Sequence, residues 1–156
     1  MKKIFYVFLL AFILIQFFQI DKTNEPVNKG VDFLTIKKTP EPIAKLINAS
    51  CYDCHSNETK YPWYASLQPV GWFLESHFED GRKHLNFSKF ATYEPKKQAH
   101  KLEEAANEIE TKEMPLDSYT IVHTETNLSD ENRKMLVEYF KKIRMEILES
   151  NQVSQY

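Results

Sequence analysis

The chain has 156 residues, which is enough for one domain with a modest hydrophobic core. Its net charge of −2, without a long basic block, excludes the charge pattern of a nucleic-acid-binding protein, and we expect no nucleic-acid partner. Only three glycines occur, which disfavours a turn-rich β-sandwich or barrel and favours helices.

The N-terminus differs from the rest of the chain. Two lysines precede an apolar run over residues 4–20 that is interrupted only by Gln16 and Gln19. A charged start followed by an apolar stretch is typical of an export signal, and no small-x-small cleavage site closes this one. At about 1.5 Å per residue the run gives roughly 26 Å of helix, marginal against a ~30 Å hydrocarbon core. We therefore predict that residues 1–20 form a signal or, preferably, an uncleaved hydrophobic anchor helix.

The two lysines also indicate the orientation of the chain. The positive-inside rule keeps Lys2 and Lys3 in the cytoplasm and places everything after Asp21 outside. The protein is then attached to the cytoplasmic membrane and faces the periplasm, or is released into the periplasm if the signal is cleaved. Residues 21–38 are polar and are predicted to be a tether, residues 39–150 to be the folded domain, and residues 151–156 to be a tail.

Four amphipathic patterns and no convincing strand predict an all-α domain with long loops. Proline is tolerated in the first turn of a helix, and serine followed by acidic residues is a favourable N-terminus. The expected helices run from near Pro40 to Cys51, over Val70 to Phe78, from near Pro95 to Ile109, and from Ser129 to Ile147.

Both cysteines of the chain lie in the stretch CYDCHSNETKYPWY, at Cys51 and Cys54, and His55 follows directly. C-x-x-C-H is the attachment sequence of c-type haem. Two thiols at this spacing can form thioether bonds to the two vinyl groups of the macrocycle, and the next residue then offers an imidazole to the iron. The motif predicts a covalently bound haem c with His55 as its proximal iron ligand.

Three other chemistries use paired cysteines. A thioredoxin-like redox pair needs a βαβ context, but here a helix leads into Cys51. A structural zinc site needs about four ligands, and a second cysteine pair is missing. A disulfide across so short a loop would stabilise little and would leave His55 without a role. Haem attachment is the favoured interpretation.

A c-type haem has a second axial position, which a methionine or a histidine can fill. Met114 lies between the third and fourth expected helices, and a proline follows it, so we predict it as the distal iron ligand. Met135 and Met145 fall within the last helix, where methionine is usually a packing residue. His123 is the alternative distal ligand.

Other residues near the motif have weaker assignments. Trp63, Tyr64 and Trp72 follow the motif closely and are predicted to pack against the haem, although they would serve equally as core. His77 lies on an apolar helix face and His84 in a basic turn. Each of these two histidines is assigned either to a haem propionate or to an ordinary structural role.

The segments CYDCHSNETKYPWY, HLNFS and MPLDSYTIVH together resemble the bacterial haem-binding domain family of small exported cytochrome c-like proteins. The resemblance covers residues 43–140. It implies a cytochrome c-like helical fold, thioether attachment at Cys51 and Cys54, and iron ligation by His55. Met114 falls at the methionine-proline motif of the family. His77, His84 and His123 also fall at family-like positions.

These features predict a one-electron carrier outside the cytoplasmic membrane, and not an enzyme. Its redox protein partners are unknown. Two alternatives remain open. A haem peroxidase or a gas or redox sensor would need Met114 to be displaced easily from the iron, and a thiol-disulfide protein would hold no haem.

Overall fold

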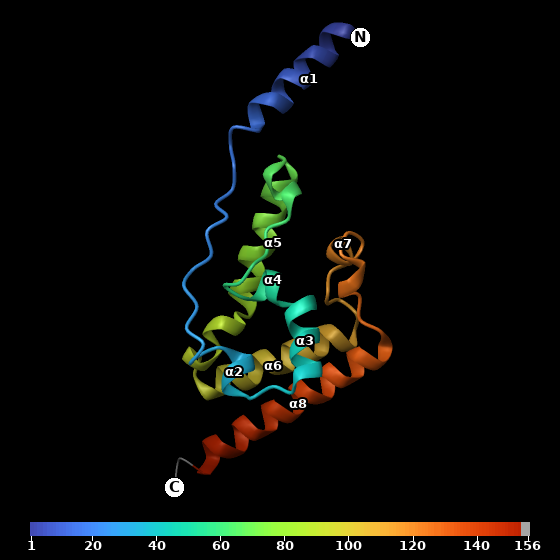
Figure 1. Cartoon of the computed structure of the whole chain (residues 1–156). Coiled ribbons are helices and arrows are strands. Elements are labelled where there is room, and N and C mark those ends of the chain that lie inside the picture. The colour runs from blue at the N-terminus through green and yellow to red at the C-terminus, as the bar shows by residue number, and fades with distance from the viewer. Residues whose placement is uncertain (154–156) are drawn as a thin grey trace.

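The computed structural model describes residues 1–153, and within them the protein is entirely helical (Figure 1). The longer helices are α1 (Lys2–Ile15), α3 (Glu41–Ser50), α5 (Val70–His84), α6 (Pro95–Glu110) and α8 (Asp130–Val153). The short ones are α2 (Phe33–Ile36), α4 (Tyr52–His55), η1 (Trp63–Ser66), η2 (Phe87–Thr92), α7 (Asp117–Thr120) and η3 (Thr124–Thr126). The all-α prediction is confirmed for this part of the chain.

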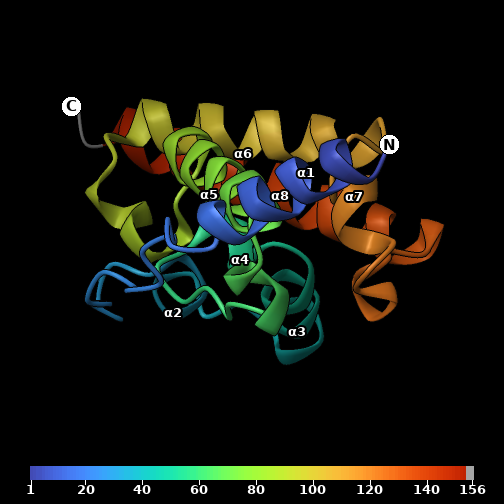
Figure 2. The same cartoon turned by 90° about the horizontal axis from the view of Figure 1, so that it is seen from above.

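Helices α6 and α8 pack against each other along their length and form the base of the domain (Figures 1 and 2). Their apolar stripes meet, and Leu102 and Leu136 are fully buried. Ser129 caps α8, because its Oγ accepts a hydrogen bond from the N–H of Asn132 at 3.1 Å. The expected starts of these two helices are confirmed, at Pro95 and immediately after Ser129.

An aromatic cluster joins the remaining elements to this base. Phe33 lies at its centre with no exposed surface, and its ring centroid is 5.2 Å from that of Phe87 and 5.8 Å from that of Phe140. Burying rings of this size is the largest apolar contribution that single side chains make to a core. Phe33 was predicted to be part of a tether over residues 21–38, but the end of that segment belongs to the core.

The predicted tail over residues 151–156 begins inside the last helix. Helix α8 continues to Val153, so residues 151–153 extend the last helix, and residues 154–156 lie outside the described part of the chain.

Helix α1 ends at Ile15, well before the apolar run ends at residue 20. The two glutamines of the run explain the difference, because both bond to η1 and its flank. The amide of Gln16 donates to the carbonyl of Gln68 at 3.0 Å, and that of Gln19 donates to the carbonyl of Ser66 at 3.2 Å. Of the helices in residues 1–153, none combines the length and apolar content that crossing a bilayer requires. The predicted anchor helix over residues 1–20 is therefore not confirmed.

Candidate functional site

A cavity of about 440 Å³ lies between α4, the C-terminal part of α5, α6 and the loop before α7. Its volume is within the usual range for small-molecule and cofactor sites. The walls are mostly apolar, and polar groups gather on α5 and α6. The apolar lining includes Leu85, Phe87, Ile109, Leu128 and Phe140.

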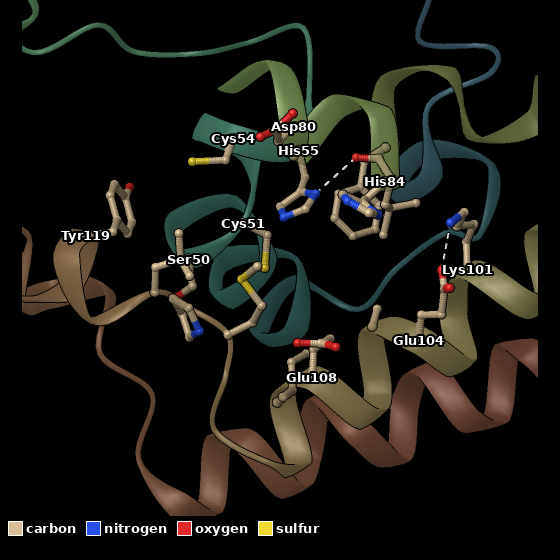
Figure 3. Close-up of a pocket in the computed structure, with 18 of the residues that line it drawn as sticks. Ser50, Cys51, Cys54, His55, Asp80, His84, Lys101, Glu104, Glu108 and Tyr119 are labelled. Atoms are coloured by element: carbon tan, nitrogen blue, oxygen red, sulfur yellow. Dashed lines mark hydrogen bonds and ion pairs between the residues drawn. The ribbon is translucent and has the colours of Figure 1, made fainter. Parts of the chain in front are cut away.

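The two cysteines lie at either end of one helical turn on the wall of this cavity. Cys51 precedes α4, and its carbonyl accepts a hydrogen bond from the N–H of His55 at 2.8 Å. Both thiols are free and line the cavity, and Figure 3 shows them with His55 around one space. Burial raises the pKa of Cys51 to about 12 and that of Cys54 to about 11, so both thiols stay protonated at neutral pH. Redox-active cysteines have lowered pKa values, which is the opposite environment.

The imidazole of His55 is oriented by hydrogen bonding to the backbone of α5 and its C-terminal flank. Its Nδ1 is 3.0 Å from the carbonyl oxygen of Leu85, drawn as a dashed line in Figure 3. A carbonyl oxygen only accepts, so Nδ1 carries the proton and Nε2 keeps its lone pair. Burial lowers the pKa of His55 and favours the neutral ring. A neutral imidazole with Nδ1 held by a carbonyl is the usual state of a histidine metal ligand.

Gly81 allows α5 to approach this turn closely. A Cβ atom at this position would lie 2.7 Å from the carbonyl oxygen of Cys54 and 3.2 Å from its Cβ. The first distance is shorter than real Cβ contacts, and the atom it meets is backbone, which cannot move aside cheaply. Sequence reasoning missed this role. The available signal was a glycine, one of only three in the chain, just past the expected end of the helix at Phe78.

Met114 lines the same cavity, on the loop that follows α6. Its backbone is held at both groups, since its N–H donates to the carbonyl of Glu108 at 3.1 Å and its carbonyl accepts from the guanidinium of Arg133 at 2.6 Å. Met135 and Met145 are exposed on α8 and do not line the cavity. The structure thus brings Met114 together with the C-x-x-C-H motif, and its role as distal iron ligand stays a prediction.

Tyr119 in α7, just after the loop that carries Met114, also reaches the motif, and sequence reasoning missed it. Its hydroxyl donates a hydrogen bond to Oδ2 of Asp53 at 2.8 Å, and its ring lines the cavity. Burial and the neighbouring carboxylate raise the pKa of Tyr119, so the hydroxyl remains a donor. The bond connects the segment after Met114 to α4.

His77 and His84 line the cavity, but His123 does not. The ring of His123 lies beside that of Tyr119, with 4.8 Å between centroids, and its Nε2 is 2.7 Å from the hydroxyl of Tyr64. This bond engages Nε2, and Nδ1 lies 3.5 Å from a carboxylate oxygen of Glu125, so both ring nitrogens have partners outside the cavity. The structure therefore does not support His123 as the alternative distal ligand.

The three aromatic residues predicted to pack against the haem lie outside the cavity. Trp63 is 77% exposed, Trp72 is 39% exposed, and neither these tryptophans nor Tyr64 line the cavity. A segment without helix follows α4 over residues 56–62, and η1 lies beyond it at the N-terminal end of α5 (Figure 1). Phe87, Tyr119 and Phe140 supply the aromatic walls instead.

The polar side of the cavity is formed by α5 and α6. Lys101 has a largely buried side chain and pairs with Glu104 at 2.7 Å (Figure 3), and Asp80, His84 and Glu108 also line the cavity. Arg82, in the basic turn around His84, does not line the cavity. Its guanidinium donates to the carbonyl of Ser56 at 2.9 Å and to the hydroxyl of Thr59 at 2.6 Å, which holds the segment after the motif.

Within residues 1–153 no group of three or more His, Cys, Asp or Glu side chains is arranged to hold a metal ion. The zinc site weighed from the cysteine pair therefore finds no support in this region.

Comparisons with known proteins bear on the same residues. A family model described as a haem-binding domain matches residues 10–142, a range that includes the motif, the cavity lining and Met114. No curated protein and no solved structure matches the chain.

Proposed function

The chain belongs to the haem-binding domain family, and from this premise we propose that it is a c-type cytochrome that carries single electrons outside the cytoplasmic membrane. The observation that carries the proposal is the cavity itself. Cys51, Cys54, His55 and Met114 come from two separate segments of the chain, yet they line one mostly apolar space. These are the side chains that covalent attachment and two-sided iron ligation require.

The chemistry of the site fits haem. The cavity has the size of a cofactor site, and its thiols are protonated and unpaired, which leaves them available for thioether bonds. The proton on Nδ1 of His55 is used by Leu85, so Nε2 is the free nitrogen. A haem bound here supplies a one-electron couple between ferrous and ferric iron.

Each residue then has a distinct part in the proposal. Cys51 and Cys54 would hold the macrocycle, and His55 and Met114 would bind the iron. Methionine ligation raises the reduction potential, which suits electron transfer. The apolar walls around Phe87 and Phe140 exclude water. No substrate is transformed, so the protein acts as a carrier and not as an enzyme.

The location outside the cytoplasm is supported by the N-terminal sequence. Two lysines followed by an apolar run are typical of an export signal, and covalent attachment retains haem where it cannot be replaced from the cytoplasm. We propose that residues 1–20 also hold the protein at the membrane.

A pyridine haemochrome spectrum of the denatured protein tests the attachment. The protein is made in a strain with c-type haem assembly, and we expect haem to stay with the polypeptide and to show the spectrum of a thioether-linked macrocycle. A Cys51→Ser/Cys54→Ser double variant should release its haem on denaturation. Release of free haem from the unmodified chain, or no haem at all, would refute the proposal.

A pair of methionine variants tests the distal ligand. Met114→Ala should abolish the red charge-transfer band of methionine-ligated ferric haem and lower the reduction potential. Met135→Ala removes an exposed methionine of α8 and should change neither. If the band is absent from the unmodified protein, the sixth position is open or labile, and a peroxidase or sensor becomes the better interpretation.

A further inference from the structure

Residues 61–74 contain no Asp, Glu, Lys, Arg or His, in a chain in which 27% of the residues are charged. The structure places this segment in η1 and the N-terminal part of α5, at the end of α5 that is remote from the cavity (Figure 1). A stretch without charges is expected in a core. Most of this one is not in the core.

Five large apolar side chains of the segment are exposed to solvent, and we call them the apical face: Trp63 (77%), Leu67 (43%), Val70 (42%), Trp72 (39%) and Phe73 (51%). Scattered exposed apolar residues are normal on a soluble protein. A group gathered on adjacent elements indicates a surface that another apolar phase covers. Contacts between η1 and α5 keep the two elements together.

Helix α1 leaves the molecule from this same end (Figure 1). Gln16 and Gln68 exchange two hydrogen bonds, at 3.0 and 2.9 Å, between side chain and backbone. The indole N–H of Trp72 donates to the carbonyl of Phe18 at 2.9 Å, so a residue of the apical face is bonded directly to the chain after α1. The apical face is therefore continuous with the N-terminal apolar segment.

The side chains of α1 indicate what covers both surfaces. No residue of α1 is buried, and after Lys3 the helix carries no charge on any face. A helix that is apolar all round belongs either in a protein core or in lipid. A partner protein or a second copy would typically meet one stripe of it, whereas lipid covers every face.

We propose that the apical face lies in the headgroup region of a lipid bilayer, beside the point where α1 enters the apolar phase. Tryptophan is enriched at this depth because its ring is apolar and its N–H needs a polar partner, which for Trp72 is the backbone of Phe18. The inference rests on the membrane attachment proposed above and is independent of haem binding. It makes the folded domain itself a membrane-contacting unit.

The contact fixes the orientation of the cavity. Helix α5 runs from the apical face at Val70 to Gly81 at the cysteine motif, a rise of roughly 16 Å at 1.5 Å per residue. The cavity is then held at a set distance from the lipid surface and does not swing freely on a tether.

The chain's only two tryptophans, Trp63 and Trp72, both lie in the apical face, so their fluorescence reports on it directly. Two variants of the full chain with its haem, Trp63→Phe and Trp72→Phe, each keep one native tryptophan. Each variant is reconstituted into phosphatidylcholine vesicles with either plain or brominated acyl chains. The ratio of emission in the two lipids cancels quenching by the haem. A matched control carries its single tryptophan at Met145→Trp in a background with both native tryptophans replaced, because Met145 is exposed on α8, away from α1.

We expect each native tryptophan to lose roughly half of its emission in the brominated lipid, and the Met145→Trp control to lose none. Vesicle-bound protein without quenching of Trp63 or Trp72 would show that α1 alone attaches the chain, and would overturn the inference while leaving attachment intact. Failure to bind vesicles would overturn both, with the haemochrome result unaffected. A concentration-dependent blue shift without lipid would assign the apical face to a second copy of the chain and would also overturn the inference.

Discussion

The two ends of helix α5 contrast sharply. Its C-terminal end meets the cysteine motif so closely that only glycine fits at position 81, whereas its N-terminal end presents Trp72 and Phe73 to solvent. Both ends contact the stretch CYDCHSNETKYPWY, the first half at α4 and the second at η1. A continuous sequence motif therefore serves two separate surfaces, and closeness to the cysteines along the chain does not mean closeness to the cavity.

The buried polar groups differ in the same way. At the cavity end, hydrogen bonds between buried polar groups hold the segment after the motif. The side-chain N–H of Asn86 donates to the side-chain carbonyl oxygen of Asn57 at 2.7 Å. The hydroxyl of Ser88 accepts from the N–H of Asn57 at 3.1 Å. Buried polar groups that are satisfied in this way specify one arrangement. At the other end of α5, the apical face presents exposed apolar side chains and not buried polar pairs.

The largest effect should follow from Phe87→Ala. This side chain is 2% exposed, lines the cavity and stacks on Tyr52 with 5.5 Å between ring centroids. Its loss should lower the free energy of unfolding by about 3–5 kcal/mol, because a buried ring leaves a void. Denaturant unfolding measures the change. A loss below about 1 kcal/mol would mean that the wall at the cavity end is not well packed.

Alkylation of the haem-free chain should show the next effect. The ordinary thiol pKa of 9.0 is raised to about 11 at Cys54, so thiolate appears only as the pH rises towards 11. At pH 8 Cys54 should react with iodoacetamide roughly 100-fold more slowly than in the unfolded chain, because the thiolate is the nucleophile. Cys51, with a pKa of about 12, should react more slowly still.

Mass spectrometry of the labelled peptides separates the two sites, and the same chain in guanidinium chloride is the control. Circular dichroism must show that the haem-free chain remains helical. Equal rates in the folded and unfolded chain would place the thiols in an open, polar environment and remove the contrast with the apical face.

A smaller effect is expected from Tyr119→Phe, which deletes the hydrogen bond to Asp53 and loosens the loop that carries Met114. A hydrogen bond of this kind contributes about 1 kcal/mol, or roughly fivefold in an equilibrium constant. In the proposed holoprotein, the imidazole concentration needed to replace Met114 at the iron should fall by that factor, as measured by the charge-transfer band. Tyr64→Phe, which removes only the bond to His123, should leave it unchanged. Equal shifts in the two variants would contradict the separation of the two ends.

The smallest effect should be that of Trp63→Ala. Trp63 is 77% exposed and does not line the cavity, so we expect the haem spectrum to be unaltered and the free energy of unfolding to change by less than about 0.5 kcal/mol. A shifted haem absorption band would restore the original prediction that this ring packs against the haem.

The sequence predicted best what periodicity and covalent spacing determine. Helices α3, α6 and α8 were expected from their amphipathic patterns and their first residues, and the C-x-x-C-H turn fixes its own local geometry. Short elements such as α2 and α7 have too few residues to show a helical period. Phe33 was missed because a single buried ring in a polar segment has no pattern around it.

The path of the chain between helices, and the contacts between residues distant in sequence, were harder to predict. Nothing local to Trp63 and Tyr64 indicates that the chain turns away from the motif after Asn57. Gly81 and Tyr119 act through partners that are distant in sequence, Cys54 and Asp53, and a single sequence does not reveal such pairs. Met114 was found because a methionine-proline loop before the last helix is a positional feature.

The hydrogen bond from His55 to Leu85 has a consequence for the redox balance of the proposed holoprotein. The Leu85 carbonyl lies just after the last residue of α5, at the helix end that carries partial negative charge. Such an acceptor polarises the Nδ1–H bond and raises the basicity of Nε2. A more basic imidazole ligand would stabilise ferric iron relative to ferrous iron. As a ligand, the thioether of Met114 would act in the opposite sense. The midpoint potential of the proposed holoprotein would then reflect the balance between these two groups.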